Sequence, residues 1–154
     1  MARTSVAVIG CGFFAQNHLN SWKDLSAKGV DLVAVCDIDP AKAQAAAEKF
    51  GVPHWYQDAE KMFGERKPDL VDIVTQVATH RELVGRAIGH RVATIVQKPF
   101  GLNIDDCRAM ADMARKANVF LAVHENFRFQ VPMRRIIALL QQGAIGEPNW
   151  ARVS

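Results

Sequence analysis

The chain has 154 residues, of which 49% are hydrophobic and 23% are charged, as is usual for one globular domain with a sizeable core. Its 19 basic and 16 acidic residues give a net charge of +3 and are scattered, without the basic cluster that favours nucleic-acid binding. No apolar run reaches the roughly 18 residues of a membrane span, and the N-terminus lacks the layout of a signal peptide.

The three cysteines, Cys11, Cys36 and Cys107, are odd in number and have no C-x-x-C spacing. This pattern favours reduced thiols in a cytoplasmic protein, and it indicates neither a disulfide framework nor a metal site. Cys11 lies between two glycines, where the need for a small side chain is a simpler explanation than a redox role.

The first apolar run, residues 6–9, leads into the sequence GCGFFA, a G-x-G-x-x-G/A pattern at a predicted strand-to-helix turn. Gly10 allows the tight turn, Gly12 has no Cβ to keep a pyrophosphate from the backbone, and Ala15 lets the helix pack closely on the sheet. The N-terminus of that helix favours phosphates. A plain strand–helix turn with two glycines is the alternative interpretation. The residues that we predict to contact a dinucleotide here are Gly10, Gly12, Phe13 and Phe14.

The second apolar run, residues 30–36, ends on Asp37, which follows Gly12 by 25 residues (37 − 12 = 25), close to the roughly 20 expected for a ribose-binding acid. A carboxylate there accepts hydrogen bonds from ribose hydroxyls and repels a 2′-phosphate, so Asp37 favours NAD over NADP. Asp39 adds negative charge, whereas Lys42 lies close enough to weaken the preference. NAD is therefore the predicted cofactor, and NADP stays open.

Apolar and helix-forming segments alternate along the rest of the chain, with Asp58 and Asn103 as predicted N-caps. This alternation predicts a doubly wound α/β domain of the Rossmann type, with a parallel sheet in the order 3-2-1-4-5-6 and the ligand at the switch point. The predicted strands cover residues 6–9, 30–36, 52–56, 70–75, 92–96 and 119–123, and the predicted helices cover residues 15–28, 41–50, 58–63, 81–88, 103–114 and 132–142.

Three segments follow the fourth, fifth and sixth strands and are expected to meet where the nicotinamide half lies: residues 75–80, residues 97–99 and residues 124–128. Among them we predict that Lys98 is catalytic, because an ammonium group beside a hydride-transfer centre stabilises negative charge on a substrate oxygen or moves a proton there. Pro99 fixes the backbone, and a cis peptide bond is an option in such a turn. A solvated Lys-Pro turn is the alternative.

The histidines and Arg128 leave more than one interpretation open. His80 and His124 each follow a strand and are candidates for ligand contact, although a lone histidine is more often structural. His18 shares a helical stripe with Trp22, and both are interpreted as packing residues. Arg128 is suited either to a substrate carboxylate or phosphate or to a helix end.

The chain resembles the N-terminal half of the glucose–fructose oxidoreductase, inositol dehydrogenase and MocA family. The similar stretches are VAVIGCGFFAQNHL, VAVCDIDP, DIVTQVATH, QKPFGLN, the Arg128-Phe129 pair and GAIGEP, in the family's order over nearly the whole chain. The resemblance implies an NAD(P)-dependent oxidoreductase of sugars, cyclitols or related polyols, with Lys98 in the family's Glu-Lys-Pro signature near nicotinamide and substrate. Gln97 replaces the usual Glu, and Ala78 replaces a common Pro. The further cofactor contacts that the resemblance implies are Thr75, His80, Gln97, Lys98, Pro99 and Arg128.

Members of that family carry a second α/β domain that holds most substrate contacts and the second catalytic group. The resemblance therefore implies that residues 1–148 form the dinucleotide-binding domain and that residues 149–154 begin the substrate domain. It also implies that the whole protein is a homo-oligomer. The chain by itself is expected to bind dinucleotide and to catalyse nothing.

Two other classes of function remain as alternatives to the dehydrogenase half. One is a nucleotide-binding module that senses or scaffolds without turnover, although the sequence contains no helix-turn-helix that would read DNA. The other is a purely structural interaction domain, which would leave Gly10, Gly12 and Asp37 without a purpose.

Overall fold

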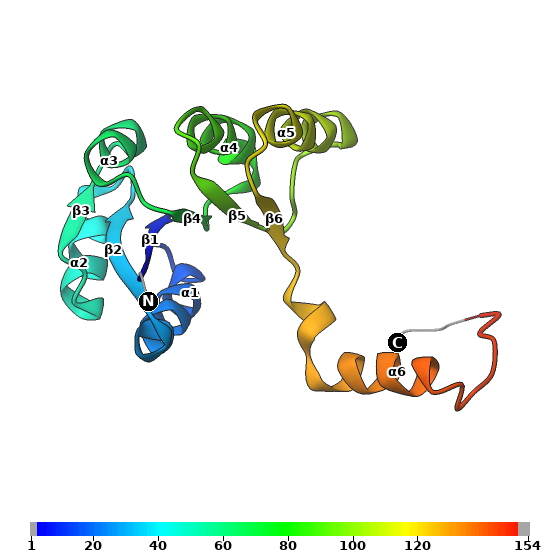
Figure 1. Ribbon diagram of the computed structural model, residues 1–154. Helices are drawn as coiled ribbons and strands as arrows, with labels where there is room; N and C mark the ends of the chain where they lie inside the picture. Colours follow the sequence, from blue (N-terminus) through cyan, green and yellow to red (C-terminus); the bar gives the residue numbers. More distant parts are fainter. Residues whose placement is uncertain (1–2, 151–154) are drawn as a thin grey trace. The chain divides into compact units, whose positions relative to one another are not determined.

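A computed structural model describes residues 3–150, and the chain divides into two compact units between His124 and Glu125. The first unit contains six strands and five α-helices, with two short 3-10 segments (Figure 1). Its elements are β1 (Thr4–Ile9), α1 (Ala15–Asp24), η1 (Leu25–Lys28), β2 (Val30–Cys36), α2 (Pro40–Phe50), β3 (His54–Tyr56), α3 (Ala59–Arg66), β4 (Leu70–Ile73), η2 (Val77–Thr79), α4 (His80–Gly89), β5 (Ala93–Gln97), α5 (Ile104–Ala117) and β6 (Leu121–His124).

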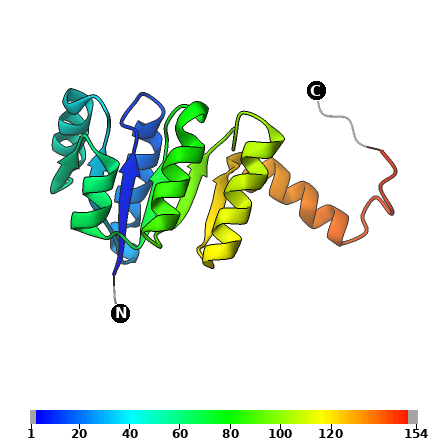
Figure 2. The ribbon, with the colours of Figure 1, turned by 90° about the horizontal axis from the view of Figure 1, so that it is seen from above.

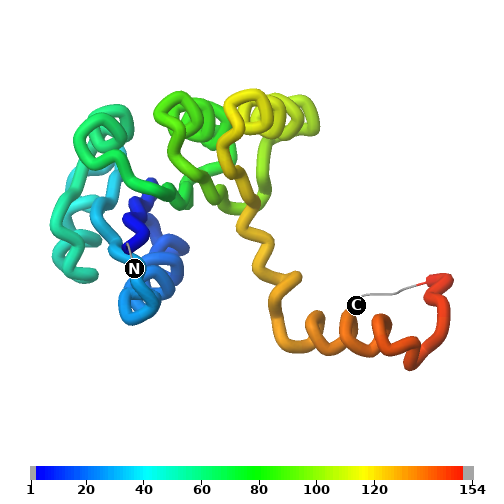
Figure 3. The backbone as a smooth tube through the Cα atoms, in the orientation of Figure 1, coloured from blue at the N-terminus to red at the C-terminus, as the bar shows by residue number. Residues whose placement is uncertain are grey.

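The six strands form one parallel sheet in the order β3-β2-β1-β4-β5-β6, which confirms the predicted Rossmann topology. The chain winds outward from β1 to β3, crosses back to place β4 beside β1, and then winds outward the other way to β6. Figure 3 follows the chain along this path. The order reverses between β1 and β4, and ligands of such sheets bind beyond the carboxyl ends of the strands at this point.

Helices cover both faces of the sheet: α1 and α2 lie on one face, and α3, α4 and α5 lie on the other (Figures 1 and 2). Each face has its own apolar cluster. The cluster under α1 and α2 includes Leu19 and Phe50, and the opposite cluster includes Phe63 and Met110. Strand β1 contributes to both clusters, because its side chains alternate between faces that are both buried. This double burial accounts for the continuous apolar run from which the strand was predicted.

Polar side chains begin three of the helices. The side chain of Asp39 accepts a hydrogen bond from the backbone N–H of Ala41, Asp58 accepts from two N–H groups at the start of α3, and Asn103 accepts from Asp106. These bonds satisfy N–H groups that have no partner within the helix. They confirm the predicted caps at Asp58 and Asn103 and add Asp39 to them.

The strand and helix types agree with the prediction, whereas several ends differ by one to four residues. The third strand begins at His54 instead of residue 52, since Pro53 has no N–H for a strand ladder. The fourth strand ends at Ile73 and not at residue 75, and Val74 donates its N–H to the carbonyl of Ile9, 2.7 Å away, as the chain turns into the next loop.

The second unit contains η3 (Asn126–Phe129) and α6 (Val131–Gln141), close to the predicted helix at 132–142. The predicted start of a strand at 149–153 is not seen at Asn149 and Trp150, and the remainder of that stretch lies outside the described residues. The domain boundary after residue 148 stays a prediction. Among residues 3–150, no helix combines the length and apolarity that crossing a lipid bilayer requires.

Candidate dinucleotide-binding site

The glycine loop between β1 and α1 has two glycines with different roles. Gly10 has a φ of +96°, and a Cβ built on it would lie 2.3 Å from the carbonyl oxygen of Val74, the residue directly after β4. Only glycine fits this close approach. A Cβ on Gly12 would meet no atom within 4 Å, so the space beside its backbone is open to a ligand.

Asp37 holds the loop in place from the end of β2. Its Oδ2 accepts a hydrogen bond from the backbone N–H of Cys11 at 2.7 Å, and its Oδ1 accepts one from Asp39 at 2.9 Å. The N–H of Gly10 donates to the carbonyl of Cys36 at 2.7 Å. The predicted ribose-binding acid is therefore also a structural link between the first two strands.

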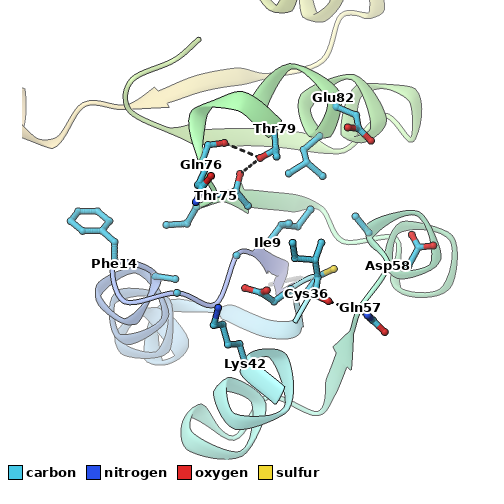
Figure 4. A pocket seen from close by; sticks show the side chains of 18 of the residues that line it. Ile9, Phe14, Cys36, Lys42, Gln57, Asp58, Thr75, Gln76, Thr79 and Glu82 are labelled. Atoms are coloured by element: carbon cyan, nitrogen blue, oxygen red, sulfur yellow. Dashed lines mark hydrogen bonds between the residues drawn. The ribbon is translucent and has the colours of Figure 1, made fainter. Parts of the chain in front are cut away.

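The glycine loop and Asp37 line the same cavity, which has a volume of about 920 Å³. This volume lies in the range of about 300–1,000 Å³ found for cofactor and ligand sites. In Figure 4, Phe14 lies at one end of the cavity, and Gln57 and Asp58 lie at the other. The lining residues are Ile9, Gly10, Gly12, Phe13, Phe14, Ala15, Cys36, Asp37, Ile38, Lys42, Gln57, Asp58, Ala59, Val74, Thr75, Gln76, Thr79, Glu82, Leu83 and Arg86.

The end of the cavity beyond Asp37 was not predicted from the sequence. Ile38 is 87% exposed and offers an apolar surface there, and its carbonyl accepts a hydrogen bond from Gln57. Glu82 and Arg86 form an ion pair across one turn of α4. The position of Ile38 directly after the ribose-binding acid was an available signal, whereas nothing near Gln57 or Arg86 in the sequence marks them as lining residues.

The ammonium group of Lys42 also lines this end of the cavity, and it lies 3.4 Å from Asp39 Oδ2. The two charges offset each other beside Asp37. The positive group that could attract a 2′-phosphate is thus already paired with a carboxylate.

The predicted residues after β4 separate into one that lines the cavity and one that does not. Thr75 lines it and accepts a hydrogen bond from the Thr79 hydroxyl at 2.8 Å. His80 is only 1% exposed, and its two ring nitrogens each lie 3.2 Å from a carbonyl oxygen, of Phe100 and of Thr75. The structure thus places His80 behind Thr75 and outside the cavity lining.

The segment after β5 lies next to the cavity at the end where Phe14 is found. The peptide bond between Lys98 and Pro99 is cis, as the sequence had suggested. The Lys98 side chain is exposed, and its Nζ lies 5.9 Å from the centre of the Phe14 ring. Gln97 is buried and is not among the residues that line the cavity. Arg128 belongs to the second unit and is described only within it.

Four side chains behind Lys98, of which Trp22 is half-buried and the others are buried, form a polar network that the sequence did not reveal. Asp72, in the middle of β4, accepts a hydrogen bond from Trp22 Nε1 at 2.7 Å and lies 2.8 Å from His18 Nδ1. His18 Nε2 lies 2.9 Å from Gln97 Nε2. His18 and Trp22 do pack against the sheet as predicted, but they also hydrogen-bond. An aspartate inside the apolar run LVDIVT was the available signal.

The cysteines beside the site are free thiols, and Cys11 and Cys36 are buried. Burial, with the negative charge of Asp37 nearby, raises the pKa of each of these two thiols to about 12. They are therefore protonated at neutral pH, and a protonated thiol is a poor nucleophile and metal ligand. Within residues 3–150, no group of three or more His, Cys, Asp or Glu side chains is arranged to hold a metal ion.

Known proteins with similar sequences are dehydrogenases. D-apiose dehydrogenase of Rhizobium rhizogenes is 44% identical over 154 residues, which are 100% of this chain and 44% of that protein. Myo-inositol 2-dehydrogenase of Thermotoga maritima is 27% identical over 149 residues, 97% of this chain and 44% of that protein. The chain thus spans less than half of the length of these relatives.

A similar solved structure is that of an oxidoreductase from Agrobacterium radiobacter in complex with NAD+, L-tartaric acid and magnesium. It superposes with a TM-score of 0.92 at 44% identity, over 97% of this chain and 43% of that one. Residues 4–125 match the family described as an oxidoreductase family with an NAD-binding Rossmann fold. This match covers most of the chain and contains both the glycine loop and Asp37. The chain belongs to that family, the glucose–fructose oxidoreductase, inositol dehydrogenase and MocA oxidoreductases.

Proposed function

We propose that this chain is the cofactor-binding half of an NAD-dependent oxidoreductase that acts on a sugar, a cyclitol or a related polyol. The observation that carries the proposal is that Gly12 and Asp37 line one cavity of suitable size at the switch point of the sheet. The substrate class is supported by the relatives, which are named for D-apiose and myo-inositol. A cytoplasmic location and a homo-oligomeric whole protein are parts of the same proposal.

The residues around the cavity have properties suited to the two ends of a dinucleotide. The open backbone beside Gly12, at the start of α1, suits the pyrophosphate, and Asp37 still has lone pairs that can accept from ribose hydroxyls. Thr75, Lys98 and Pro99 are proposed for the nicotinamide side. His80 and Gln97 are proposed to support these residues from behind, since both are buried. Arg128 remains a proposed contact from the second unit.

Asp37 is proposed to favour NAD over NADP, because its carboxylate repels a 2′-phosphate. The pairing of Lys42 with Asp39 supports the same preference, since a lysine engaged with a carboxylate attracts a further anion less strongly. NADP binding is expected to be weaker and not absent.

Lys98 is proposed as the catalytic residue of the whole protein. When bound, the nicotinamide supplies the hydride chemistry. The ammonium of Lys98 is exposed beside Phe14, where it can hold a substrate oxygen and move a proton to or from it. Positioned proton transfer of this kind contributes about 10²- to 10⁴-fold to a rate.

Calorimetric titration of the chain with NAD and, separately, with NADP tests the cofactor proposal. Gly12→Ala is expected to keep the fold, because its new methyl group meets no atom within 4 Å, and to lose NAD affinity. Gly64→Ala is the matched control, since Gly64 lies in α3 outside the cavity and its added Cβ also meets nothing. Equal NAD affinity for both variants would contradict the proposal.

Turnover of the whole protein tests the role of Lys98. D-apiose, myo-inositol and other polyols are offered with NAD, and NADH formation is followed for the unaltered protein, Lys98→Ala and Lys98→Arg. We expect Lys98→Ala to lower kcat by at least about 10²-fold with little change in NAD affinity. Binding of NAD without oxidation of any polyol, in the whole protein, would instead favour a sensing or scaffolding module.

A further inference from the structure

We propose that His18 is a positioning residue for Lys98: a neutral imidazole, protonated on Nδ1, that orients the Gln97 side chain and through it the Lys98 backbone. The part that concerns Lys98 rests on the proposed function. The hydrogen-bond network itself does not, because it follows from the donor and acceptor properties of buried groups.

The backbone N–H of Lys98 sets the direction of the first hydrogen bond. It lies 2.7 Å from the Oε1 atom of Gln97, and a backbone N–H can only donate. The carbonyl oxygen of the Gln97 amide must therefore face Lys98. This orientation directs the amide NH₂ of Gln97 at His18 Nε2, 2.9 Å away.

The amide of Gln97 in turn sets the tautomer of His18. Its NH₂ group can only donate, so His18 Nε2 must accept and carries no proton. The proton of the neutral ring then lies on Nδ1, which donates to Asp72 Oδ2 at 2.8 Å. The same oxygen accepts a second hydrogen bond from Trp22 Nε1 at 2.7 Å. One fixed backbone donor thus assigns every proton along the row.

The network is closed to solvent and joins three elements of the sheet unit. His18 is 4% exposed, Asp72 is 2% exposed and Gln97 is 6% exposed. They come from α1, β4 and β5, so the helix that follows the glycine loop is tied to the residue before Lys98. Buried networks of this kind rigidify the groups that they connect. Here the hydrogen bonds of Asp72 all go to Oδ2, and its Oδ1 is buried without a partner among the described residues. Displacement of His18 would be transmitted to the Lys98 backbone.

Other ionisable groups face His18 as well. The ring of His124, on β6, has its centre 4.5 Å from that of His18. The Phe14 ring packs edge-on against the His18 ring, with 5.6 Å between the two ring centres. The Lys98 ammonium group lies over the same Phe14 ring. The charged and titratable groups around His18 are thus Asp72, His124 and, across the Phe14 ring, Lys98.

A glutamate at position 97, the usual residue of the family signature, would change the protonation of this row. Both carboxylate oxygens are acceptors, so the oxygen that faces His18 Nε2 would meet a lone pair. Both hydrogen bonds of the His18 ring could then be kept only if His18 took up a second proton or the new carboxyl group were itself protonated. Glutamine at this position therefore keeps every hydrogen bond of the row while His18 is neutral.

Nitrogen NMR of the imidazole rings in the isotope-labelled chain tests the assignment of His18. We expect the spectrum of a neutral ring protonated on Nδ1 in the unaltered chain and that of an imidazolium in Gln97→Glu near neutral pH. His18→Gln identifies the resonances. An imidazolium or an Nε2-protonated ring in the unaltered chain would overturn the proposal, as would an unchanged His18 spectrum in Gln97→Glu at a pH where carbon NMR shows the new carboxyl group to be ionised.

The pH dependence of turnover in the whole protein tests the consequence for Lys98. Gln97→Glu is expected to approach the unaltered kcat at low pH, where His18 is protonated and donates to the new carboxylate. Its kcat should fall about 10- to 100-fold relative to the unaltered protein as the pH rises, because small displacements of a reacting group cost this much.

Gln97→Met keeps the side-chain volume but cannot hydrogen-bond to His18 or to the Lys98 backbone, so its kcat should be low at every pH. Parallel pH profiles for the two variants would overturn the positioning role. If Lys98→Ala left turnover unchanged, the proposed function would fail, whereas the ring spectrum of His18 would still decide the network.

Discussion

Asp37 combines two tasks in one carboxylate, because it bonds the glycine loop and also lines the cavity. The backbone N–H groups of Cys11 and Asp39 each take one of its oxygens. An amide in its place could accept from only one of them and would turn its NH₂ group toward the other. A change at this residue therefore affects the fold and the cofactor site together.

For Asp37→Asn we expect the free energy of unfolding to fall by about 1–3 kcal/mol, since one partly buried N–H donor loses its acceptor. The preference for NAD over NADP should shrink at the same time, because the charge that repels a 2′-phosphate is gone. Urea denaturation and calorimetric titration measure the two effects. Asp39→Asn is the control, as it removes a charge nearby but leaves a good N-cap on α2. Identical results for both variants would argue against a special role of Asp37.

The buried thiols of Cys11 and Cys36 make stability depend on pH in alkaline solution. Their pKa is raised from 9.0 to about 12 in the folded chain by burial. Above the unfolded value the unfolded chain loses thiol protons that the folded chain retains, so their contribution is fully present below about pH 9 and declines toward pH 12. Urea denaturation between about pH 8 and pH 10 should show a steeper decline for the unaltered chain than for the double variant Cys11→Ala, Cys36→Ala. Equal slopes would contradict the raised values.

At the scale of single residues, the sequence predicts well those site residues that lie close together along the chain. Gly10, Gly12 and the cysteine between them lie in one short pattern, and Asp37 follows at a spacing that the intervening helix determines. The row from Trp22 through Asp72 and His18 to Gln97 was not predictable, because three separate elements bring these residues together. The same holds for His80, whose partner Phe100 is 20 residues away in sequence.

The turn from β1 into α1 is the element most sensitive to a single substitution. In Gly10→Ala the new methyl group would overlap the Val74 carbonyl at 2.3 Å, in a backbone conformation with a φ of +96° that alanine disfavours. Val74 cannot retreat, because its N–H donates to Ile9 and the two strands are paired.

We therefore expect Gly10→Ala to destabilise the chain by at least about 2 kcal/mol, with lower NAD affinity as a consequence. Thermal unfolding and NAD titration together separate this variant from Gly12→Ala, which should lose affinity alone. Unchanged thermal stability of Gly10→Ala would show that the loop can move away from β4.

Element types were predictable because apolar periodicity and helix formers mark them over many residues. The ends of the elements were less predictable, because a strand ends where its hydrogen bonds to the neighbouring strand end and not where its apolar run ends. Val74 and Thr75 continue the β-branched run of β4, but the chain leaves the sheet after Ile73. Helix caps were the exception, because Asp58 and Asn103 mark the first turn by their own side chains.

On the scale of the whole molecule, the sheet unit contains every lining residue of the cavity, and the unit boundary follows His124. The family match ends at almost the same place, at residue 125. The order of the strands followed from the sequence, because alternating strands and helices with right-handed crossovers allow few arrangements. The separation into two units did not follow from the sequence, because the helix after residue 130 has the same amphipathic pattern as the helices before it.

The two edge strands of the sheet, β3 and β6, differ in how well they could pair with another strand. This difference bears on association between copies of the chain in concentrated solution. Strand β3 has only three residues and follows a proline, which makes it a poor template for another strand. Strand β6 has four residues, with Phe120 just before it 60% exposed and Val123 within it 37% exposed. Edge-to-edge association of copies, where it occurs, is therefore expected along β6. Val123→Lys should suppress this association in light-scattering measurements.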